Sequence, residues 1–233
     1  MAVLLRRRQS ILKRMILPLF IALPLVGLAN EARPAALVDA VLAEVDSTVI
    51  TASDIALARG LRLFGFEPDE APIRSEGVDR FVDTLLVEQE AVRLQILPAE
   101  EEANAAWNSV ATRLGGREAF LAWLDENRIS QSWARRMVEA DLVWRRFIAL
   151  RFRAFAFVSE SDVDAALGQG PHTSEEREKV RQTLLGTATQ ESLATWVQEA
   201  RGRARITRVT LPAEGFPPPF KMPAEPLQER NTK

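Results

Sequence analysis

Apolar side chains recur at helical spacing through residues 78–150, and this periodicity constrains the fold more than any other feature of the chain. In the segment 78–97 they fall three or four positions apart, which places them on one face of an amphipathic helix. A second stripe, in a longer helix that Ser130 caps, is largely aromatic. Large rings supply the buried area that an interior helix needs, so we interpret this stripe as core rather than as a ligand site. The two stripes are Val78, Phe81, Val82, Leu85, Val92 and Ile96 in the first helix, and Trp133, Met137, Ala140, Trp144 and Phe147 in the second.

Turn and cap signals divide the rest of the chain into shorter helices and a few short strands. Two segments rich in aliphatic and β-branched residues flank the turn dipeptide Asp46-Ser47 and predict a hairpin. Hydroxyl residues followed by acidic ones predict helix starts after Thr51 and Thr173. The further elements are helices at about 53–63, 100–114, 118–127, 159–167 and 175–203, and a strand at 204–209. The sequence therefore predicts a mainly α, multi-helix fold with a small β element formed by the N-terminal hairpin and the C-terminal strand.

Residues 1–29 have the composition of a targeting segment. Basic residues cluster at positions 6–14, and an uncharged apolar run of 14 residues follows at 16–29. A membrane span needs about 20 apolar residues, whereas a shorter run is typical of a signal-peptide core. Small residues predict cleavage after Ala29 or Ala32. We therefore expect a signal peptide at 1–29, export by the general secretory route and no stable membrane insertion after cleavage; an uncleaved anchor is the alternative.

The composition excludes several kinds of catalytic and metal site. The chain has no cysteine, so it can form no disulfide, no thiolate metal site and no lipoprotein anchor, and it has no cysteine nucleophile. Its single histidine, His172, lies in a glycine- and proline-containing segment at 168–173, which is typical of a solvated loop. One histidine cannot build a histidine-rich metal site. We expect no catalytic residue, no metal and no other cofactor.

The charge of the exported chain argues against nucleic acid as a partner. The whole chain has 30 basic and 32 acidic residues, and residues 1–29 hold five of the basic ones and none of the acidic ones. Removal of this segment leaves 25 basic against 32 acidic residues, a net charge of −7. Gripping nucleic acid requires clustered cations that face phosphates. We therefore expect a partner that is not a nucleic acid.

An ordered series of segments resembles the periplasmic survival-protein-A (SurA) chaperones. The run 39–55 is similar to the N-terminal hairpin and first helix of that family, and Phe81–Ala91 is similar to its core helix. Gly115–Phe120, followed by Leu124 and the dipeptide Ile129-Ser130, is similar to the family signature ahead of the long helix. The resemblance implies a SurA N-terminal-like chaperone domain, the part of these proteins that holds unfolded outer-membrane polypeptides.

The chain departs from the family pattern after residue 158. Family members continue from a short helix, similar to residues 159–167 here, into a parvulin-type prolyl isomerase domain. In this chain only Gly168–Pro171 intervenes before the next helix start. The helix at 175–203 and the strand at 204–209 resemble the closing segment that returns to the N-terminal lobe. The resemblance therefore implies that the isomerase domain is absent, and that the protein is an ATP-independent periplasmic holdase for envelope or outer-membrane polypeptides rather than an enzyme.

These inferences divide the chain into four parts and leave two other functions open. We expect a signal peptide at 1–29, an N-terminal helical chaperone domain at 30–158, a helix and strand at 159–209 that complete the same domain, and a proline-rich tail at 210–233. The alternatives are a divergent peptidyl-prolyl isomerase and a scaffold with one dedicated folded partner. A homodimer through a domain swap is also open, because the C-terminal segment must reach a distant lobe across a short link.

Exposed aromatic residues are the candidates for client contact, because a holdase needs apolar surface rather than a positioned acid or base. Phe64 and Phe66 lie at a predicted loop junction. Phe152, Phe155 and Phe157 recur in an arginine-containing segment directly after the long helix. The nearly alternating pattern of that segment also fits a short strand or extended segment with one buried face, which would give these residues a packing role.

The tail at 210–233 differs in composition from the rest of the chain. It holds six prolines within about two dozen residues, which favours extended or disordered chain. Disorder is the prediction we prefer. The alternative is a docking peptide, since Phe216 and Phe220 flank a triple proline and could bind a groove, including one on this protein in an autoinhibitory manner.

Overall fold

The computed structural model describes residues 39–223 of the chain. The chain divides into two units after Ala36, so the described residues all belong to the second unit. The signal peptide predicted at 1–29 lies outside the described residues, as does the end of the tail from residue 224 onward.

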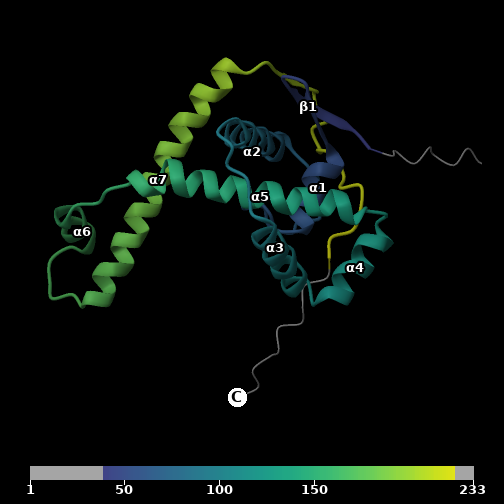
Figure 1. Ribbon diagram of the computed structural model, residues 1–233. Helices are drawn as coiled ribbons and strands as arrows, with labels where there is room; N and C mark the ends of the chain where they lie inside the picture. Colours follow the sequence, from purple (N-terminus) through teal and green to yellow (C-terminus); the bar gives the residue numbers. More distant parts are fainter. Residues whose placement is uncertain (1–38, 224–233) are drawn as a thin grey trace, which may run out of the picture. The chain divides into compact units, whose positions relative to one another are not determined.

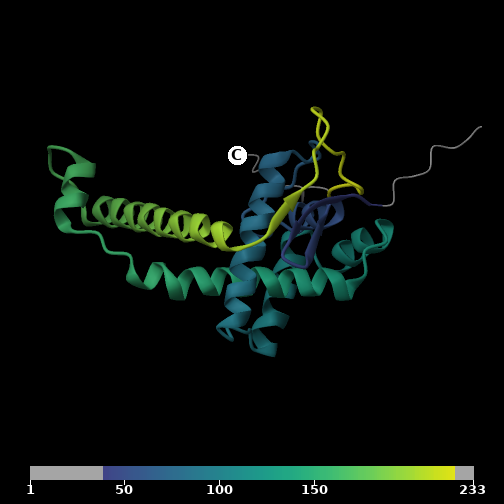
Figure 2. The same cartoon turned by 90° about the horizontal axis from the view of Figure 1, so that it is seen from above.

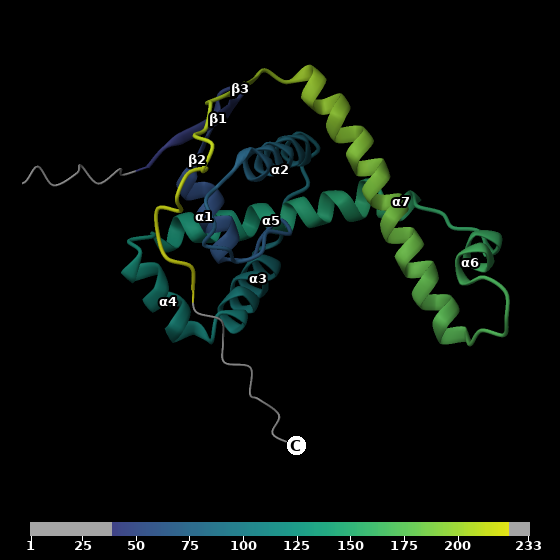
Figure 3. The same cartoon turned by 180° about the vertical axis from the view of Figure 1, so that it is seen from behind.

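A small antiparallel sheet joins the two ends of the described chain. Strands β1 (Val41–Val45) and β2 (Thr48–Thr51) form a hairpin, and β3 (Ile206–Arg208) pairs with the other edge of β1. The strand order is therefore β2-β1-β3 (Figure 3). Asp46, at the hairpin turn, has a φ of 54°, a conformation that Asp and Asn tolerate better than most residues. The sheet confirms the prediction of a small β element built from the N-terminal hairpin and the C-terminal strand.

Helices make up most of the remaining described chain (Figure 1). They confirm the mainly α prediction, with shifts of a few residues at several ends. None of the helices within residues 39–223 combines the length and the apolarity that a membrane span needs. The helices are α1 (Ala52–Gly60), α2 (Ser75–Arg93), α3 (Glu100–Arg113), α4 (Arg117–Glu126), α5 (Gln131–Arg151), the 3-10 turn η1 (Arg153–Phe155), α6 (Glu160–Leu167) and α7 (Ser174–Arg203).

Side-chain caps start several of these helices where the sequence indicates them. Thr51, Ser130, Ser159 and Thr173 each accept a hydrogen bond from the backbone N–H three residues later. In three of these caps an acidic residue at that third position bonds back to the cap backbone and completes a capping box; α5 alone among the four lacks this reciprocal bond. Each cap satisfies N–H groups that lack a partner inside the helix, so local sequence alone fixes these starts.

The main core lies where α5 packs against α2 and α3 beneath the sheet. Phe120 is fully buried there, and the Trp107 ring, tilted by 57°, lies 4.7 Å from it between centroids, while Phe147 is fully buried in a smaller second cluster around Phe152. The aromatic stripe of α5 faces this interior: Met137 is buried, while Trp133 and Trp144 are partly buried and pack against the core. The interpretation of that stripe as core is therefore confirmed.

Helix α6 and the first half of α7 lie away from α1–α4 (Figures 1 and 2). We call this part, residues 160–188, the arm. Ion pairs of Arg177 with Glu160 and Asp164, and of Arg181 with Glu160, join α6 to α7. The buried residues of α7 are Thr189, Val197 and Ala200, all in its second half. Only the second half of α7 therefore packs on the helical body, by which we mean α1–α5. The arm is held mainly by the contacts between α6 and the first half of α7.

The tail from residue 210 to residue 223 follows the surface of the helical body instead of being disordered (Figure 3, yellow). The backbones of Ile73 and Phe216 exchange two hydrogen bonds of 2.6 and 2.8 Å. Further along, the Lys221 backbone bonds to the side chains of Trp123 on α4 and of Asn127, which directly follows that helix. The preferred prediction of disorder is therefore wrong for this part of the tail. The physical reason is that its extended backbone finds hydrogen-bond partners at Ile73, just before α2, and at the end of α4.

Candidate peptide-binding surfaces

Phe64 and Phe66 lie in the core rather than at a surface open to clients. Their exposed fractions are 4% and 5%. The ring of Phe64 stands edge-on to Phe81 and Trp144, each at 6.1 Å between centroids. Phe64 adopts a φ of 54°, and its backbone N–H donates to the Asp141 carboxylate at 2.7 Å. This turn directs the ring inward, so the burial of Phe64 and Phe66 holds the loop after α1 against α2 and α5.

Phe152 is also buried, with an exposed fraction of 8%. Its ring lies 5.7 Å from Phe147 and 6.2 Å from Trp196, so it fills the junction between α5 and α7. The strand that the alternating pattern allowed is absent here, because residues 153–155 form a 3-10 turn. Phe152 therefore has a packing role.

Phe155 and Phe157 are the two predicted client-contact residues that the structure places in solvent. Their exposed fractions are 80% and 82%, and Leu150, at the end of α5, is 56% exposed. The short turn after α5 points these side chains away from the core that holds Phe152. We call residues 150–157 the exposed linker, and it connects α5 to the arm. Arginine side chains at 151 and 153 are exposed between its apolar residues.

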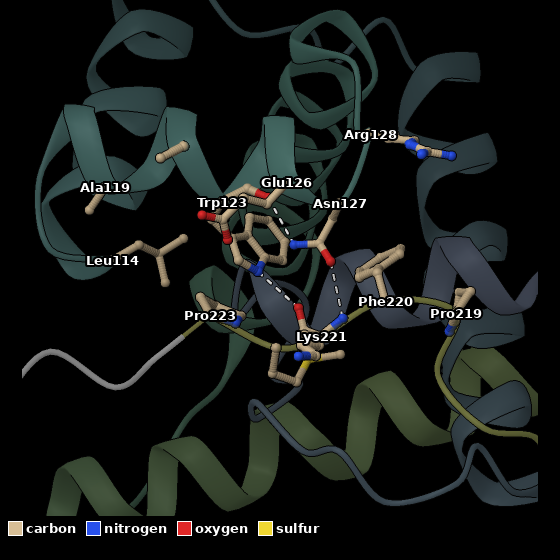
Figure 4. Close-up of a pocket in the computed structure, with 12 residues that line it drawn as sticks. Leu114, Ala119, Trp123, Glu126, Asn127, Arg128, Pro219, Phe220, Lys221 and Pro223 are labelled. Carbon is tan, nitrogen blue, oxygen red and sulfur yellow. Dashed lines mark hydrogen bonds between the residues drawn. The ribbon is translucent and has the colours of Figure 1, made fainter.

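A second surface lies on α4, where the tail crosses it (Figure 4). The indole Nε1–H of Trp123 donates to the Lys221 carbonyl at 2.9 Å, and the Lys221 N–H donates to Oδ1 of Asn127 at 3.1 Å. A cavity of about 730 Å³ adjoins these residues, and the tail from Pro219 to Pro223 forms one of its walls. We call this place the α4 groove. Its other lining residues are Leu114, Ala119, Ala122, Trp123, Glu126, Asn127 and Arg128.

Contacts on two sides fix the Trp123 ring in the α4 groove. A Cβ added to Gly60 would lie 2.8 Å from the ring, so α1 approaches the indole as closely as a glycine allows. Phe220 stands edge-on to Trp123, with the centroids 6.1 Å apart and the planes at 80°. The indole is 7% exposed. The tail is therefore part of the cover over an aromatic side chain that carries a hydrogen-bond donor.

Two carboxyl groups buried wholly or partly in the body, Asp54 and Asp141, have structural partners rather than the open geometry of an acid or base catalyst. Burial raises the pKa of Asp141, while the Phe64 N–H and the Arg145 guanidinium oppose that shift. Burial likewise raises the pKa of Asp54, which caps α1 together with Thr51. Within residues 39–223 no group of three or more His, Cys, Asp or Glu side chains could hold a metal ion. The two surfaces therefore offer apolar contact and backbone hydrogen bonds.

Sequence reasoning missed Trp123 and Asn127 as binding residues. It assigned Trp123 only to a short helix, although the spacing of the two residues does place them on one face of α4. Their partner, Lys221, lies 98 residues beyond Trp123 in the chain. The alternative that Phe216 and Phe220 dock into a groove of this protein does describe the tail, because both side chains pack against the main core.

Comparisons of the chain with models of known protein families and with curated proteins gave no match. The resemblance to SurA-type chaperones therefore stays a prediction from the sequence. The function proposed below depends on the exposed linker and the arrangement of the helices.

Proposed function

We propose that the chain is an ATP-independent chaperone that holds unfolded envelope or outer-membrane polypeptides. The observation that carries this proposal is the exposure of Phe155 and Phe157, at 80% and 82%, directly after the buried Phe152. Large apolar side chains gathered on a surface mark interaction sites. Burying one such ring against a client would contribute about 1.5–3 kcal/mol. Two rings thus give a weak contact from which a client can dissociate.

The surroundings of the exposed linker suit chains that are unfolded rather than one folded partner. The linker lies beside the arm, most of whose side chains are in solvent. Several weak contacts on one molecule add up through effective concentration, and they need no single deep pocket. Arg151 and Arg153 add positive charge between the apolar residues, which favours acidic segments of a client. Neither contact requires a nucleotide, a metal or a catalytic side chain.

The resemblance to SurA-type chaperones supports the same function. It rests on the hairpin, the order of the helices and the returning C-terminal strand, which together correspond to the client-binding part of those proteins. We propose by the same resemblance that the chain performs no prolyl isomerisation, because residues 168–171 replace the isomerase domain.

The proposal is tested by light scattering of a denatured outer-membrane protein diluted into buffer without nucleotide. The mature chain should suppress aggregation at near-stoichiometric amounts. The double variant Phe155→Ser/Phe157→Ser should lose at least half of this suppression and keep its thermal stability. The matched control is Val41→Ser/Val49→Ser, which removes side chains that are 51% and 48% exposed on the hairpin of β1 and β2. This control should suppress aggregation as the unaltered chain does.

Four results would contradict the proposal. Aggregation that proceeds unchanged in the presence of the chain would remove the general chaperone function. Equal losses in the linker variant and in the control would show that the linker has no special role. Capture of one folded partner with nanomolar affinity, without binding of unfolded chains, would favour the scaffold function. Turnover of a proline-containing peptide would instead favour the isomerase function.

We also propose that the protein acts in the periplasm, on the basis of the signal peptide predicted at 1–29. The full chain, tagged at its C-terminus, should appear in the periplasmic fraction. Mass spectrometry of that material should give a new N-terminus at Asn30 or at Arg33, as expected for cleavage after Ala29 or Ala32. Retention of the intact chain in the membrane fraction would favour the uncleaved anchor.

A further inference from the structure

At Lys221 the α4 groove recognises the backbone of the tail rather than the side chain. Both hydrogen bonds at its centre reach one residue, since Trp123 donates to the Lys221 carbonyl and Asn127 accepts from the Lys221 N–H. The Lys221 side chain is exposed, and the described residues contain no ion pair to it. Any residue other than proline carries the same N–H and C=O groups. The contact therefore selects extended backbone and is neutral to the side chain at this position.

The two α4 side chains are held in place for this contact. The Asn127 Nδ2–H donates to the Trp123 carbonyl at 2.8 Å, so its Oδ1 is directed toward the tail. The Trp123 ring is fixed by its close approach to Gly60. A site whose groups are already positioned loses little rotamer freedom when a peptide binds. These contacts come from α4 and α1 and do not depend on the tail.

The apolar part of the α4 groove accommodates a phenylalanine and prolines. Phe220 lies edge-on to Trp123, and Pro223 approaches Gly60. Aromatic rings that carry an N–H donor commonly bind proline-containing extended segments, because such segments present regular carbonyl groups at low entropic cost. The groove thus combines a ring contact with a hydrogen-bonded pair one residue later.

The tail is attached at two separate points, and the second can open while the first stays closed. The first is the backbone pairing of Ile73 with Phe216. Residues 217–219 are prolines, which have no N–H and cannot continue that pairing. The second is the contact of Lys221 with α4. Release of residues 219–223 therefore breaks two hydrogen bonds and one ring contact without disturbing the sheet.

We propose that the α4 groove is a binding site for extended polypeptide segments that carry an aromatic residue near proline, and that the chain's own segment 219–223 occupies it in their absence. The inference depends on the proposed function, because it assigns a second client-binding surface to the holdase. The tethered tail competes with a client at an effective concentration in the millimolar range. A client segment gains access when the tail leaves, so the tail limits binding to clients present at high local concentration or bound elsewhere on the molecule.

The test measures binding of a fluorescein-labelled peptide with the sequence of residues 217–223 to the full mature chain by fluorescence anisotropy. The variant Phe220→Ala/Lys221→Pro removes the ring contact and one hydrogen bond from the chain's own tail. It should bind the peptide at least ten-fold more tightly than the unaltered chain, because its tail no longer competes. A peptide with alanine in place of its phenylalanine should bind at least ten-fold more weakly.

Variants of the groove itself show where the peptide binds. In the tail-release background, Trp123→Phe removes the indole donor and keeps an aromatic ring, and Asn127→Ala removes the acceptor. Each should weaken peptide binding at least ten-fold. Asn108→Ala, at an exposed position on α3, is the matched control and should leave binding unchanged. Circular dichroism melts of all variants verify that each one folds.

Each contrary result overturns the proposal. If the tail-release variant binds no more tightly than the unaltered chain, or if Trp123→Phe and Asn127→Ala bind as well as the control, the α4 groove is not a peptide site. A dimer that dissociates in the tail-release variant would assign the groove to the tail of a second copy. The aggregation assay on the same proteins separates the two proposals. If the chain suppresses aggregation but does not bind the peptide, only the inference about the α4 groove is contradicted. If it neither suppresses aggregation nor binds the peptide, the chaperone function is contradicted as well.

Discussion

Asp141 is the buried carboxylate on which the loop after α1 depends. It is 5% exposed, accepts from the Phe64 N–H at 2.7 Å and forms an ion pair with Arg145 at 2.7 Å. Asp141→Ala should lower the free energy of unfolding by about 2–4 kcal/mol, because the Phe64 N–H would stay buried without an acceptor. Urea denaturation measures this loss. Asp141→Asn retains an acceptor oxygen and should cost less; equal losses in the two variants would contradict the role of this hydrogen bond.

Glu88 on α2 makes the free energy of unfolding depend on pH, and the direction of its pKa shift fixes the sign of that dependence. Burial raises its pKa and no other cause opposes the shift. The folded state therefore holds this proton more tightly than the unfolded state does, so the contribution of Glu88 to stability is greatest below its unfolded pKa and is lost as the pH rises through the folded pKa. Glu88→Gln should raise the free energy of unfolding at pH 7 by about 1 kcal/mol. The gain should vanish at about pH 3, below the unfolded value.

Glu90 is the matched control for this measurement. Its hydrogen bond to Arg93 lowers its pKa, so its contribution has the opposite sign and is present above the unfolded pKa. Glu90→Gln should therefore destabilise the protein at pH 7. Denaturant titrations at a series of pH values measure both variants, and a parallel response of the two would show that burial does not govern Glu88.

At the level of single elements, the two ends of α7 should differ in stability. The buried residues of α7 lie at Thr189, Val197 and Ala200, and Arg201 bonds to the Asp79 carbonyl on α2 at 2.9 Å. The first half of α7 is joined to α6 by ion pairs at the surface, which contribute little to stability, and Val163 is the one buried residue of α6. Amides of the arm should therefore exchange with solvent deuterium before those of α5, as mass spectrometry of peptide fragments would detect. Equal protection of the arm and α5 would contradict this difference.

The segment after α5 shows how one turn separates two roles. Phe152 packs against Phe147 and Trp196, whereas Phe155 is 80% exposed. Phe152→Ala should cost about 3–5 kcal/mol, because it leaves a cavity between α5 and α7. Phe155→Ala should change stability by less than about 0.5 kcal/mol. Thermal denaturation compares the pair, and a large loss in Phe155→Ala would show that its ring is buried in solution.

For the described molecule as a whole, Gly215 controls how the tail closes over the body. It has a φ of +83°, and a Cβ there would lie 2.8 Å from the Ile73 carbonyl oxygen and 2.9 Å from the Pro72 Cβ. Gly215→Val should therefore break the pairing of Ile73 with Phe216 and expose the tail. Trypsin should then cleave after Lys221 several-fold faster, as mass spectrometry of the released C-terminal fragment would show.

Gly186→Ala is the matched control for tail release, because a Cβ at Gly186 meets nothing within 4 Å. Its cleavage rate after Lys221 should equal that of the unaltered chain. Equal rates in Gly215→Val and the control would show that the pairing at Ile73 does not hold the tail in place.

The sequence by itself determined the elements of the fold. The caps at Thr51, Ser130, Ser159 and Thr173 act over three residues, and the hairpin turn at Asp46 acts over four, so each signal lies within the segment that it shapes. The aromatic stripe of α5 was also readable as core, because helical periodicity places it on one face. Ends of helices without a side-chain cap were less certain: α2 begins at Ser75 and ends at Arg93, although its stripe indicated 78–97.

Only the tertiary structure decided which aromatic residues are buried and where the tail lies. Phe152 and Phe155 are the same residue type in the same segment, and they differ because Trp196 of α7 covers one of them. The α4 groove likewise forms from residues 94 and 98 positions apart. Such contacts depend on how the whole chain closes on itself, and a local pattern carries no information about which distant segment will arrive. The elements are therefore local properties of this sequence, whereas its binding surfaces are properties of the folded chain.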